Sequence, residues 1–382
     1  MSSTTRVLHV AEVIKGGTAT YLSEIDFGDT GTTHFRYLVP EDELRHLPPA
    51  RQGSAMTFKG RSKRALNLIA MMPAILECEK SGKFDVIHAH GTYAGICVRI
   101  LRLLGFVKTP IVYCAHGWAF DREASEKIKF AYAFVERILQ PHAEKIVCIS
   151  NHDYTSALDR GLKKDNLVVV LNGIDDRSPS SPIPNKNQPT ILFAGRFDKQ
   201  KGVDVFLSSI NYCKSNFRAI AVGDVSSGDL AISKENAKVE FPGWVERAEV
   251  QRLIDACDVF VMPSRWEGFG LSALEAMRAG KAVIASSVGG LTELVLDGET
   301  GYLVPPGDAK ALASAIDRAA NSDTAAMGAK GRERFLNLFT SQRLRQELFA
   351  LYAKVKQQSS SGPPSSTRND ERQAQDIKYN AR

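Results

Sequence analysis

The chain has 382 residues, of which 43% are hydrophobic and 24% are charged. This length and composition are typical of a globular protein with two domains, and they exclude collagen-like, disulfide-rich and wholly disordered chains. The 49 basic and 43 acidic residues give a net charge of +6. This mild excess suits anionic ligands or a membrane surface, and it falls far short of the charge typical of a nucleic-acid-binding protein.

The six cysteines are scattered without a Cys-x-x-Cys pair, and most of them lie in apolar runs. This pattern indicates small buried side chains in a reducing compartment. The chain enters a strand pattern directly after residues 1–6, without the features of a signal peptide. The longest apolar stretch, residues 66–76, is too short to span a bilayer. We therefore expect a cytoplasmic protein.

The first half of the chain alternates apolar runs with helical patterns. The runs that predict strands are 7–10, 86–88, 111–114, 146–149 and 168–171. The helical patterns start at Thr18 and cover 65–80, 95–104, 125–139 and 152–160. Such alternation predicts a parallel sheet with helices on both faces, in which ligands bind beyond the carboxyl ends of the strands.

The second half repeats this alternation after a stretch rich in Ser, Pro and Asn. Its predicted strands are 190–194, 219–222, 239–241, 259–262, 282–285 and 302–304, and its predicted helices are 309–320, 324–338 and 343–355. The α/β pattern thus predicts two doubly wound, Rossmann-like domains that face a central cleft. The predicted boundaries are 1–176 for the first domain, 177–188 for the linker, 189–340 for the second domain, 341–356 for a segment that packs back on the first domain, and 357–382 for a disordered tail.

The stretch from Pro263 to Glu275 combines a glycine-rich turn with the start of a helix near Gly270. A helix N-terminus suits a phosphate, and the small residues Gly268 and Gly270 let a ligand approach the backbone. Glu267 and Glu275 bracket the turn, and carboxylates accept hydrogen bonds from the paired hydroxyls of a sugar or ribose. The alternative is that Glu267 is an ordinary loop residue and that Glu275 lies on a solvated helix face. The apolar neighbours of Glu275 disfavour this alternative.

A second polar loop, residues 195–202, directly follows a predicted strand. Arg196 and Lys201 in this loop could reach one anionic group, Arg196 as a planar fork and Lys201 as a mobile point charge. A solvated charged loop is the alternative. The neighbouring Glu267–Glu275 stretch favours a diphosphate site.

Gly16 and Gly17 follow the first strand and precede a helix. They allow close approach of a phosphate or sugar, although a simple tight turn explains them nearly as well. The third glycine of a dinucleotide-binding loop is absent.

Histidines follow two further strands. His116 could hydrogen-bond a sugar hydroxyl, and His90 and Tyr93 could line the acceptor side; a satisfied structural histidine is the alternative. A zinc site needs three or more converging ligands, and the spacing of Cys and Asp supplies none. No Asp-x-Asp pair occurs. We therefore predict no metal ligands and metal-independent chemistry without a cofactor.

Two other segments carry weaker signals. Residues 241–245, which end at Val245, could form an apolar wall for a nucleobase or an ordinary turn. The basic residues from Lys59 to Arg64 precede the apolar segment 66–76, and such an element can lie on an anionic membrane. A buried helix with a solvated basic start is the more common explanation.

The Glu267-x7-Glu275 pair, together with Gly195-Arg196 and Lys201-Gly202, resembles the signature of retaining glycosyltransferases of family 4, which have the GT-B fold. The resemblance covers roughly residues 7–354 and is densest over 172–304. The chain departs from it at Ala282, where the family usually has proline.

The resemblance implies transfer of a sugar from a nucleotide-diphosphate sugar with retention of configuration. Arg196 and Lys201 would stabilise the departing diphosphate, Glu275 would bind the ribose and His116 would orient the sugar. Glu267 would bind the hydroxyls of the donor sugar. Two mechanisms stay open for the transfer step: Glu267 acts as a nucleophile, or the acceptor attacks the same face that the diphosphate leaves, with assistance from the phosphate. The donor-contacting positions that it implies are Gly16, Gly17, Arg196, Lys201, Val245, Glu267, Gly268, Phe269, Gly270, Leu271 and Glu275.

Residues 7–17 resemble the start of enzymes of bacterial exopolysaccharide and capsule assembly. This implies a saccharide acceptor that is linked to a lipid. UDP is the default nucleotide of the donor. Peripheral contact with the inner face of the cytoplasmic membrane would accompany such an acceptor, and no nucleic acid is expected. Two other functions stay open at this point: a nucleotide-sugar epimerase of the same fold and a non-catalytic nucleotide-sugar-binding module.

Overall fold

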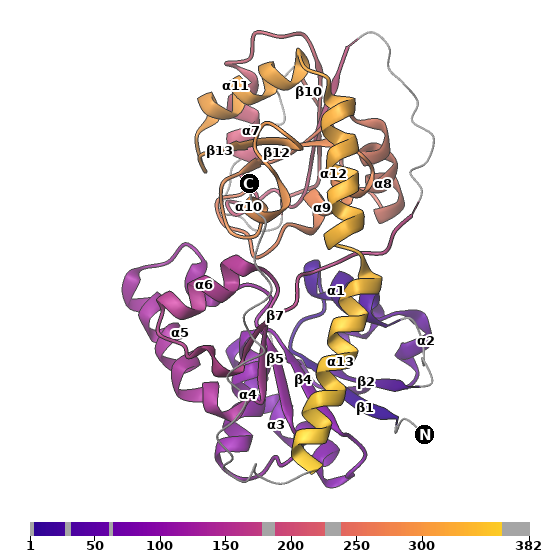
Figure 1. Ribbon diagram of the computed structural model, residues 1–382, viewed down its shortest axis with the longest axis vertical. Coiled ribbons are helices and arrows are strands. Elements are labelled where there is room, and N and C mark those ends of the chain that lie inside the picture. The colour runs from indigo at the N-terminus through magenta and orange to yellow at the C-terminus, as the bar shows by residue number, and fades with distance from the viewer. Residues whose placement is uncertain (1–3, 27–31, 61–63, 178–187, 226–237, 361–382) are drawn as a thin grey trace, which may run out of the picture.

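The computed structural model describes residues 4–26, 32–60, 64–177, 188–225 and 238–360. Within these residues the strands form two sheets, one in each half of the chain, and every pairing between strands is parallel. Figure 1 shows the two halves stacked along the long axis of the molecule. The predicted α/β class with two doubly wound sheets is therefore confirmed.

The first sheet has the strand order β3-β2-β1-β4-β5-β6-β7 in the described part of the chain. Its strands are β1 (Thr5–Ala11), β2 (Thr33–Pro40), β3 (Met56–Phe58), β4 (Val86–His90), β5 (Ile111–Cys114), β6 (Lys145–Cys148) and β7 (Leu167–Val169). Its helices are α1 (Gly17–Ile25), α2 (Pro49–Gln52), α3 (Arg64–Lys80), α4 (Thr92–Leu103), α5 (Glu126–Leu139) and α6 (Asn151–Asp159), with short 3-10 turns at Glu41–His46, Ala119–Asp121, Gln140–His142 and Lys164–Asn166. Strands β2 and β3 were not predicted from the sequence.

The second sheet has the strand order β10-β9-β8-β11-β12-β13. Its strands are β8 (Thr190–Ala194), β9 (Arg218–Val222), β10 (Val239–Gly243), β11 (Val259–Met262), β12 (Ala282–Ser286) and β13 (Gly301–Val304). Its helices are α7 (Val203–Ile210), α8 (Arg247–Ala256), α9 (Leu271–Arg278), α10 (Leu291–Leu294), α11 (Ala309–Ala320) and α12 (Thr324–Leu338). Strands β8, β11 and β12 are buried along nearly their whole length, because helices cover both faces of a parallel sheet.

The last helix, α13 (Ser341–Ser360), leaves the second half and packs against α1, β1 and β4 of the first. The hydroxyl of Tyr352 on α13 lies 2.6 Å from Nδ1 of His88 on β4. The tail was predicted to start at residue 357, but α13 continues to Ser360. Most of the predicted linker, and the tail after Ser360, lie outside the described residues.

The helix α3 occupies the segment for which a membrane contact was considered. It packs on α4 and buries Asn67, Met71, Ile75 and Cys78, whereas Ile69 is exposed. This arrangement favours the alternative of a buried helix; the side chains of residues 61–66 lie outside the description. Among the described residues, every helix is too short or too polar to cross a bilayer.

Candidate active site between the two halves

Glycines shape the loop that carries Glu267 between β11 and α9. Gly270 caps α9 with φ of 102°, a left-handed conformation that suits glycine. Gly289 also has a positive φ, and a Cβ atom there would lie 1.7 Å from the carbonyl oxygen of Glu267. The loop can therefore pass close to the segment that follows β12 only because Gly289 lacks a side chain.

Lys201 and Glu267 are in direct contact. Nζ of Lys201 donates a hydrogen bond to Oε2 of Glu267 at 2.6 Å, although 66 residues separate them in the chain. Their side chains are 20% and 12% exposed, so the pair lies partly sheltered from water. Strand β8, which leads into the Lys201 loop, is hydrogen-bonded to β11, which leads into the Glu267 loop. Two of the predicted residues are thus brought together by neighbouring strands.

Arg196 lies on the same loop as Lys201 but is more exposed. Nη2 of Arg196 donates to Oε1 of Gln200 at 2.9 Å and lies 3.0 Å from Oδ2 of Asp198. Nε2 of Gln200 donates in turn to the carbonyl oxygen of Trp266 at 3.3 Å. With 51% of its side chain exposed, Arg196 can exchange these partners for a ligand at low cost.

Glu275 lies in the second turn of α9. Its side chain is 12% exposed, and Oε1 lies 3.4 Å from Nη2 of Arg247 on α8. The solvated alternative considered for this residue does not fit its burial. Sequence reasoning did not single out Arg247, because no motif marks it.

Loops of the first half meet the start of α9. A Cβ atom on Gly117, after β5, would lie 3.1 Å from Cα of Gly268, and one on Gly17, at the start of α1, would lie 3.7 Å from Cδ1 of Leu271. The hydroxyl of Ser150 donates to the carbonyl oxygen of Gly268 at 3.5 Å. The predicted glycine loop and the loop of His116 therefore face the Glu267 loop across the two halves.

The remaining predicted residues differ in what they can offer. Gly16 has φ of 56° and open space around its Cα. The ring of Phe269 is buried and packs edge-on against Phe339, so only the backbone of Phe269 can face a ligand. Val245 is half-buried against the core, beside Trp244, which is 71% exposed.

Four histidines lie next to one another on β1, β4 and the loop after β5. Ligand atoms of His9, His88 and His90 lie within 4.8 Å of one another, so three possible metal ligands do converge. The spacing of Cys and Asp in the sequence, on which the prediction of no metal ligands rested, does not reveal these histidines. His90 was expected to line the acceptor side, but it is only 1% exposed, and this expectation was wrong.

Burial lowers the pKa of each of these histidines. Desolvation lowers the pKa of His9 to about 3 and that of His116 to about 4, and it holds the pKa values of His88 and His90 well below the usual range. The four rings are therefore neutral at neutral pH. One feature of the sequence could have revealed this cluster. Two adjacent strands each carry a histidine at the same register position, with His9 on β1 opposite His88 on β4.

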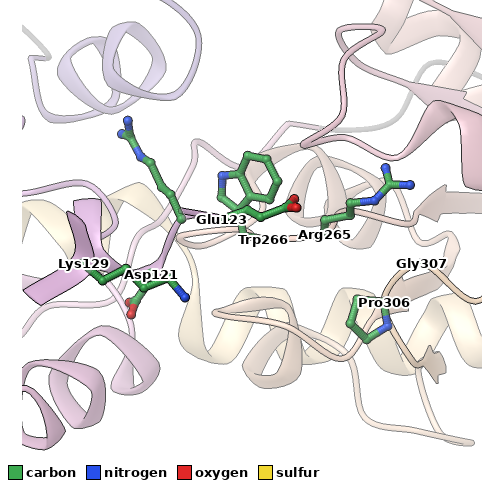
Figure 2. A pocket seen from close by; sticks show the side chains of 8 residues that line it. Asp121, Glu123, Lys129, Arg265, Trp266, Pro306 and Gly307 are labelled. Atoms are coloured by element: carbon green, nitrogen blue, oxygen red, sulfur yellow. The ribbon is translucent and has the colours of Figure 1, made fainter. Parts of the chain in front are cut away.

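An open pocket of about 390 Å³ lies beside the Glu267 loop. Figure 2 shows the indole ring of Trp266 at its centre, with Asp121 and Lys129 from the first half on one side and Pro306 and Gly307 on the other. Its lining residues are Asp121, Arg122, Glu123, Lys129, Arg265, Trp266, Pro306 and Gly307. None of the predicted donor-binding residues lines it, so it is a neighbouring site rather than the donor site itself.

Two parallel-sheet halves whose strand ends face each other across a charged site have the architecture of the GT-B fold. Sequence comparison agrees. A profile of glycosyl transferases group 1 matches residues 188–322, and one of glycosyltransferase family 4 matches residues 35–178. The chain belongs to glycosyltransferase family 4 and is a hexosyltransferase.

Relatives and solved structures resemble the chain over most of its length. An uncharacterized 41.2 kDa protein in the cps region of Klebsiella pneumoniae is 33% identical over 81% of this chain and 89% of its own. The UDP-Gal:alpha-D-GlcNAc-diphosphoundecaprenol alpha-1,3-galactosyltransferase of Escherichia coli is 26% identical over 67% of this chain and 72% of its own. The crystal structure of Anabaena HepE in complex with UDP and glucose superimposes with a TM-score of 0.76 at 23% identity, and covers 92% of this chain and 100% of its own.

Proposed function

We propose that the enzyme transfers a sugar from a nucleotide-diphosphate sugar, with UDP as the favoured nucleotide, to a lipid-linked saccharide, with retention of configuration. The reaction would serve the synthesis of a cell-surface polysaccharide. The names of the relatives support this choice, since one lies in a cps region and another acts on a diphosphoundecaprenol-linked sugar. A solved structure of the same fold holds UDP and glucose.

The observation that carries the proposal is the contact between Lys201 and Glu267 beside the N-terminus of α9. A cation and a carboxylate in contact beside a helix N-terminus match the two parts of a sugar diphosphate, because the cation and the backbone N–H groups suit the diphosphate and the carboxylate suits the sugar hydroxyls. Lys201 and Arg196 would bind the diphosphate, together with the N–H groups at the start of α9. Glu267 would bind the hydroxyls of the sugar, and Glu275 those of the ribose.

The leaving diphosphate gains negative charge as the sugar departs. Fixed cations and backbone N–H groups stabilise such charge best when they are already in place. Lys201 meets this condition, because its contact with Glu267 and its burial hold Nζ in position. We propose that these groups suffice without a divalent cation, so that transfer persists in excess chelator.

The pocket around Trp266 would receive the acceptor saccharide. Its indole ring can stack on the apolar face of a sugar, and Asp121 and Glu123 can accept hydrogen bonds from hydroxyls. The pocket adjoins Glu267 through the chain itself, because Trp266 is the preceding residue. Lys129, which also lines it, lies on α5.

The exposed face of α5 would contact an anionic membrane in place of α3. Ile128, Phe130, Phe134 and Ile138 are each about half exposed or more, with exposed fractions of 50%, 61%, 48% and 49%. The guanidinium group of Arg137 lies 5.8 Å from the ring centres of both phenylalanines. Aromatic and cationic side chains on one helix suit the interface of an anionic bilayer, and this helix begins at the proposed acceptor pocket.

A transfer assay tests the proposed function. The purified enzyme is incubated with a panel of radiolabelled nucleotide sugars and a lipid extract of the source membrane, in buffer with excess EDTA. We expect label from one UDP-sugar to enter the lipid fraction, and Lys201→Met to abolish this while Lys354→Met, an exposed lysine on α13, does not. Conversion of the donor to an epimer without acceptor, or nucleotide binding without any transfer, would contradict the proposal.

Vesicle sedimentation tests the membrane contact separately. Wild-type enzyme should sediment with vesicles of anionic phospholipid, and Phe130→Ser with Phe134→Ser should release it. Leu336→Ser, which changes an exposed leucine on α12, is the matched control and should still sediment. If both variants sediment with the vesicles to the same extent, the exposed face of α5 does not contact the membrane.

A further inference from the structure

A row of hydrogen-bonded imidazole rings connects the core of the first sheet to the active site. Nδ1 of His9 lies 2.8 Å from Nε2 of His90, and Nδ1 of His90 lies 2.9 Å from Nε2 of His116. Adjacent strands create the row, because β4 lies between β1 and β5. His9 and His90 are buried, whereas His116 is half-buried. The backbone carbonyl oxygen of His116 lies against the facing Glu267 loop, where a Cβ atom on Gly268 would be 3.2 Å from it.

The row permits two arrangements of protons. Each neutral imidazole carries one N–H group and one bare nitrogen, so the three rings must donate in the same direction. In one arrangement His9 donates to His90 and His90 donates to His116, which leaves the proton of His116 on Nδ1. In the other arrangement every bond is reversed, and His116 carries its proton on Nε2.

The inner end of the row decides between these arrangements. Nε2 of His9 is buried and has no hydrogen-bond partner among the described residues. The first arrangement leaves a bare nitrogen there, whereas the second leaves a buried N–H group without an acceptor. Among backbone groups, a buried N–H group without an acceptor is rarer than a buried acceptor without a donor, and we apply the same order to the imidazole nitrogens. The first arrangement is therefore favoured.

We propose that His90 is a positioning residue that, together with His9, fixes His116 in the tautomer with its proton on Nδ1. Nε2 of His116 is occupied by the hydrogen bond from His90, so Nδ1–H is the group that remains to meet a ligand. It would donate to a hydroxyl oxygen of the donor sugar. This last step rests on the proposed function, but the tautomer itself does not.

Other features of His116 agree with a fixed ring. Its backbone has φ of 56°, an uncommon and strained conformation for a residue with a side chain, which the surrounding structure must enforce. The ring of Tyr21 packs edge-on against it with ring centres 4.7 Å apart, and the hydrogen bond with His90 holds its Nε2 edge. These two contacts prevent the ring of His116 from rotating into an orientation that would suit the other tautomer.

The tautomer can be read without any substrate. Long-range ¹H–¹⁵N correlation spectra of wild-type enzyme labelled at histidine distinguish a protonated from a bare ring nitrogen. We expect the proton of His116 on Nδ1. A proton on Nε2 would overturn the inference whether or not the enzyme transfers a sugar. Stoichiometric zinc in the purified protein would also overturn it, because a metal held by His9 and His90 would replace their hydrogen bond.

Two substitutions of His90 test the role in turnover. The side-chain amide of Asn places an N–H group where Nδ1 of histidine lies, whereas that of Gln places one near Nε2. His90→Asn should therefore still donate to His116 and keep the wild-type tautomer and kcat. His90→Gln should lose that bond and lower kcat by about fivefold or more, the weight of one neutral hydrogen bond, with an unchanged Kd for nucleotide. Equal kcat values for two variants that unfold at the same temperature would contradict the role of His90.

Discussion

Nζ of Lys201 lies 2.6 Å from Oε2 of Glu267, and this contact joins the two loops that follow the neighbouring strands β8 and β11. Each residue thus holds the other in place at the mouth of the site. A donor that uses both must insert its diphosphate beside Nζ and its sugar beside the carboxylate. Donor binding as proposed here requires this geometry.

Removal of the Lys201 ammonium group should weaken nucleotide binding. A charge-assisted hydrogen bond contributes about 1.5–3 kcal/mol, so Lys201→Met should raise the Kd of a nucleoside diphosphate by roughly 10- to 100-fold. Titration calorimetry with UDP, GDP and ADP measures this change. The control is Lys354→Met on α13, and unchanged affinity in Lys201→Met would exclude Lys201 from the diphosphate site.

The Glu267 carboxylate should matter for transfer more than for nucleotide binding. Glu267→Gln removes a negative charge next to Lys201, so the Kd of the nucleoside diphosphate should stay the same or fall. The rate of transfer should fall at least about 100-fold, because the sugar loses a group that positions it. Glu333→Gln, on the exposed side of α12, serves as the control. Weaker nucleotide binding with an intact transfer rate would reverse this assignment.

Glu275 should distinguish ribose from deoxyribose. The wild-type enzyme should bind UDP more tightly than 2′-deoxy-UDP, and Glu275→Gln should narrow this difference. The pair with Arg247 is exposed on the Arg247 side, so its loss should change the free energy of unfolding by less than about 1 kcal/mol. If the wild-type enzyme binds both nucleotides equally, Glu275 does not contact the 2′-hydroxyl.

The close passage of Gly289 past Glu267 should be sensitive to a single methyl group. Gly289→Ala adds a Cβ atom 1.7 Å from a backbone oxygen, and this displaces the Glu267 loop. Gly298→Ala is a matched control, because Gly298 also has a positive φ but has open space around it. Both variants should lose about 1 kcal/mol of stability from backbone strain, but only Gly289→Ala should also lose transfer activity. Equal activity in both would show that the loop adapts.

The buried histidines should make the fold sensitive to acid. Burial lowers the pKa of His9 to about 3 and that of His116 to about 4, so below the ordinary value near 6.5 the unfolded chain binds more protons than the folded one. The free energy of unfolding should be fully present above about pH 6.5 and should fall as the pH falls toward 4, by up to about 1.4 kcal/mol per pH unit for each histidine. Urea titrations at several pH values test this. A wild-type curve without a slope in this range would contradict the burial of neutral imidazoles.

Much of the fold could be predicted because parallel strands buried on both faces leave continuous apolar runs. Strands β8 and β11 were placed from such runs with little error. Strand β2 was missed because His34 and Arg36 interrupt its apolar pattern, and β3 was missed because the exposed Thr57 interrupts its three residues. The residues of a strand alone do not predict it when its burial depends on packing against neighbouring strands and helices.

The candidate site was predictable where its residues follow strands directly, as Lys201 and Glu267 do. The histidine row was not, because it depends on the order of strands in the sheet. His9 and His116 are more than 100 positions apart, and only the placement of β4 between β1 and β5 joins them through His90. The pocket around Trp266 likewise needs both halves in place.

A crystal structure of the enzyme with its nucleotide-sugar donor tests the central claim most directly. We predict that the diphosphate contacts Arg196, Lys201 and the backbone N–H groups at the start of α9, with Glu275 on the ribose and Glu267 on the sugar. A donor bound at another surface, with these four side chains untouched, would contradict the account.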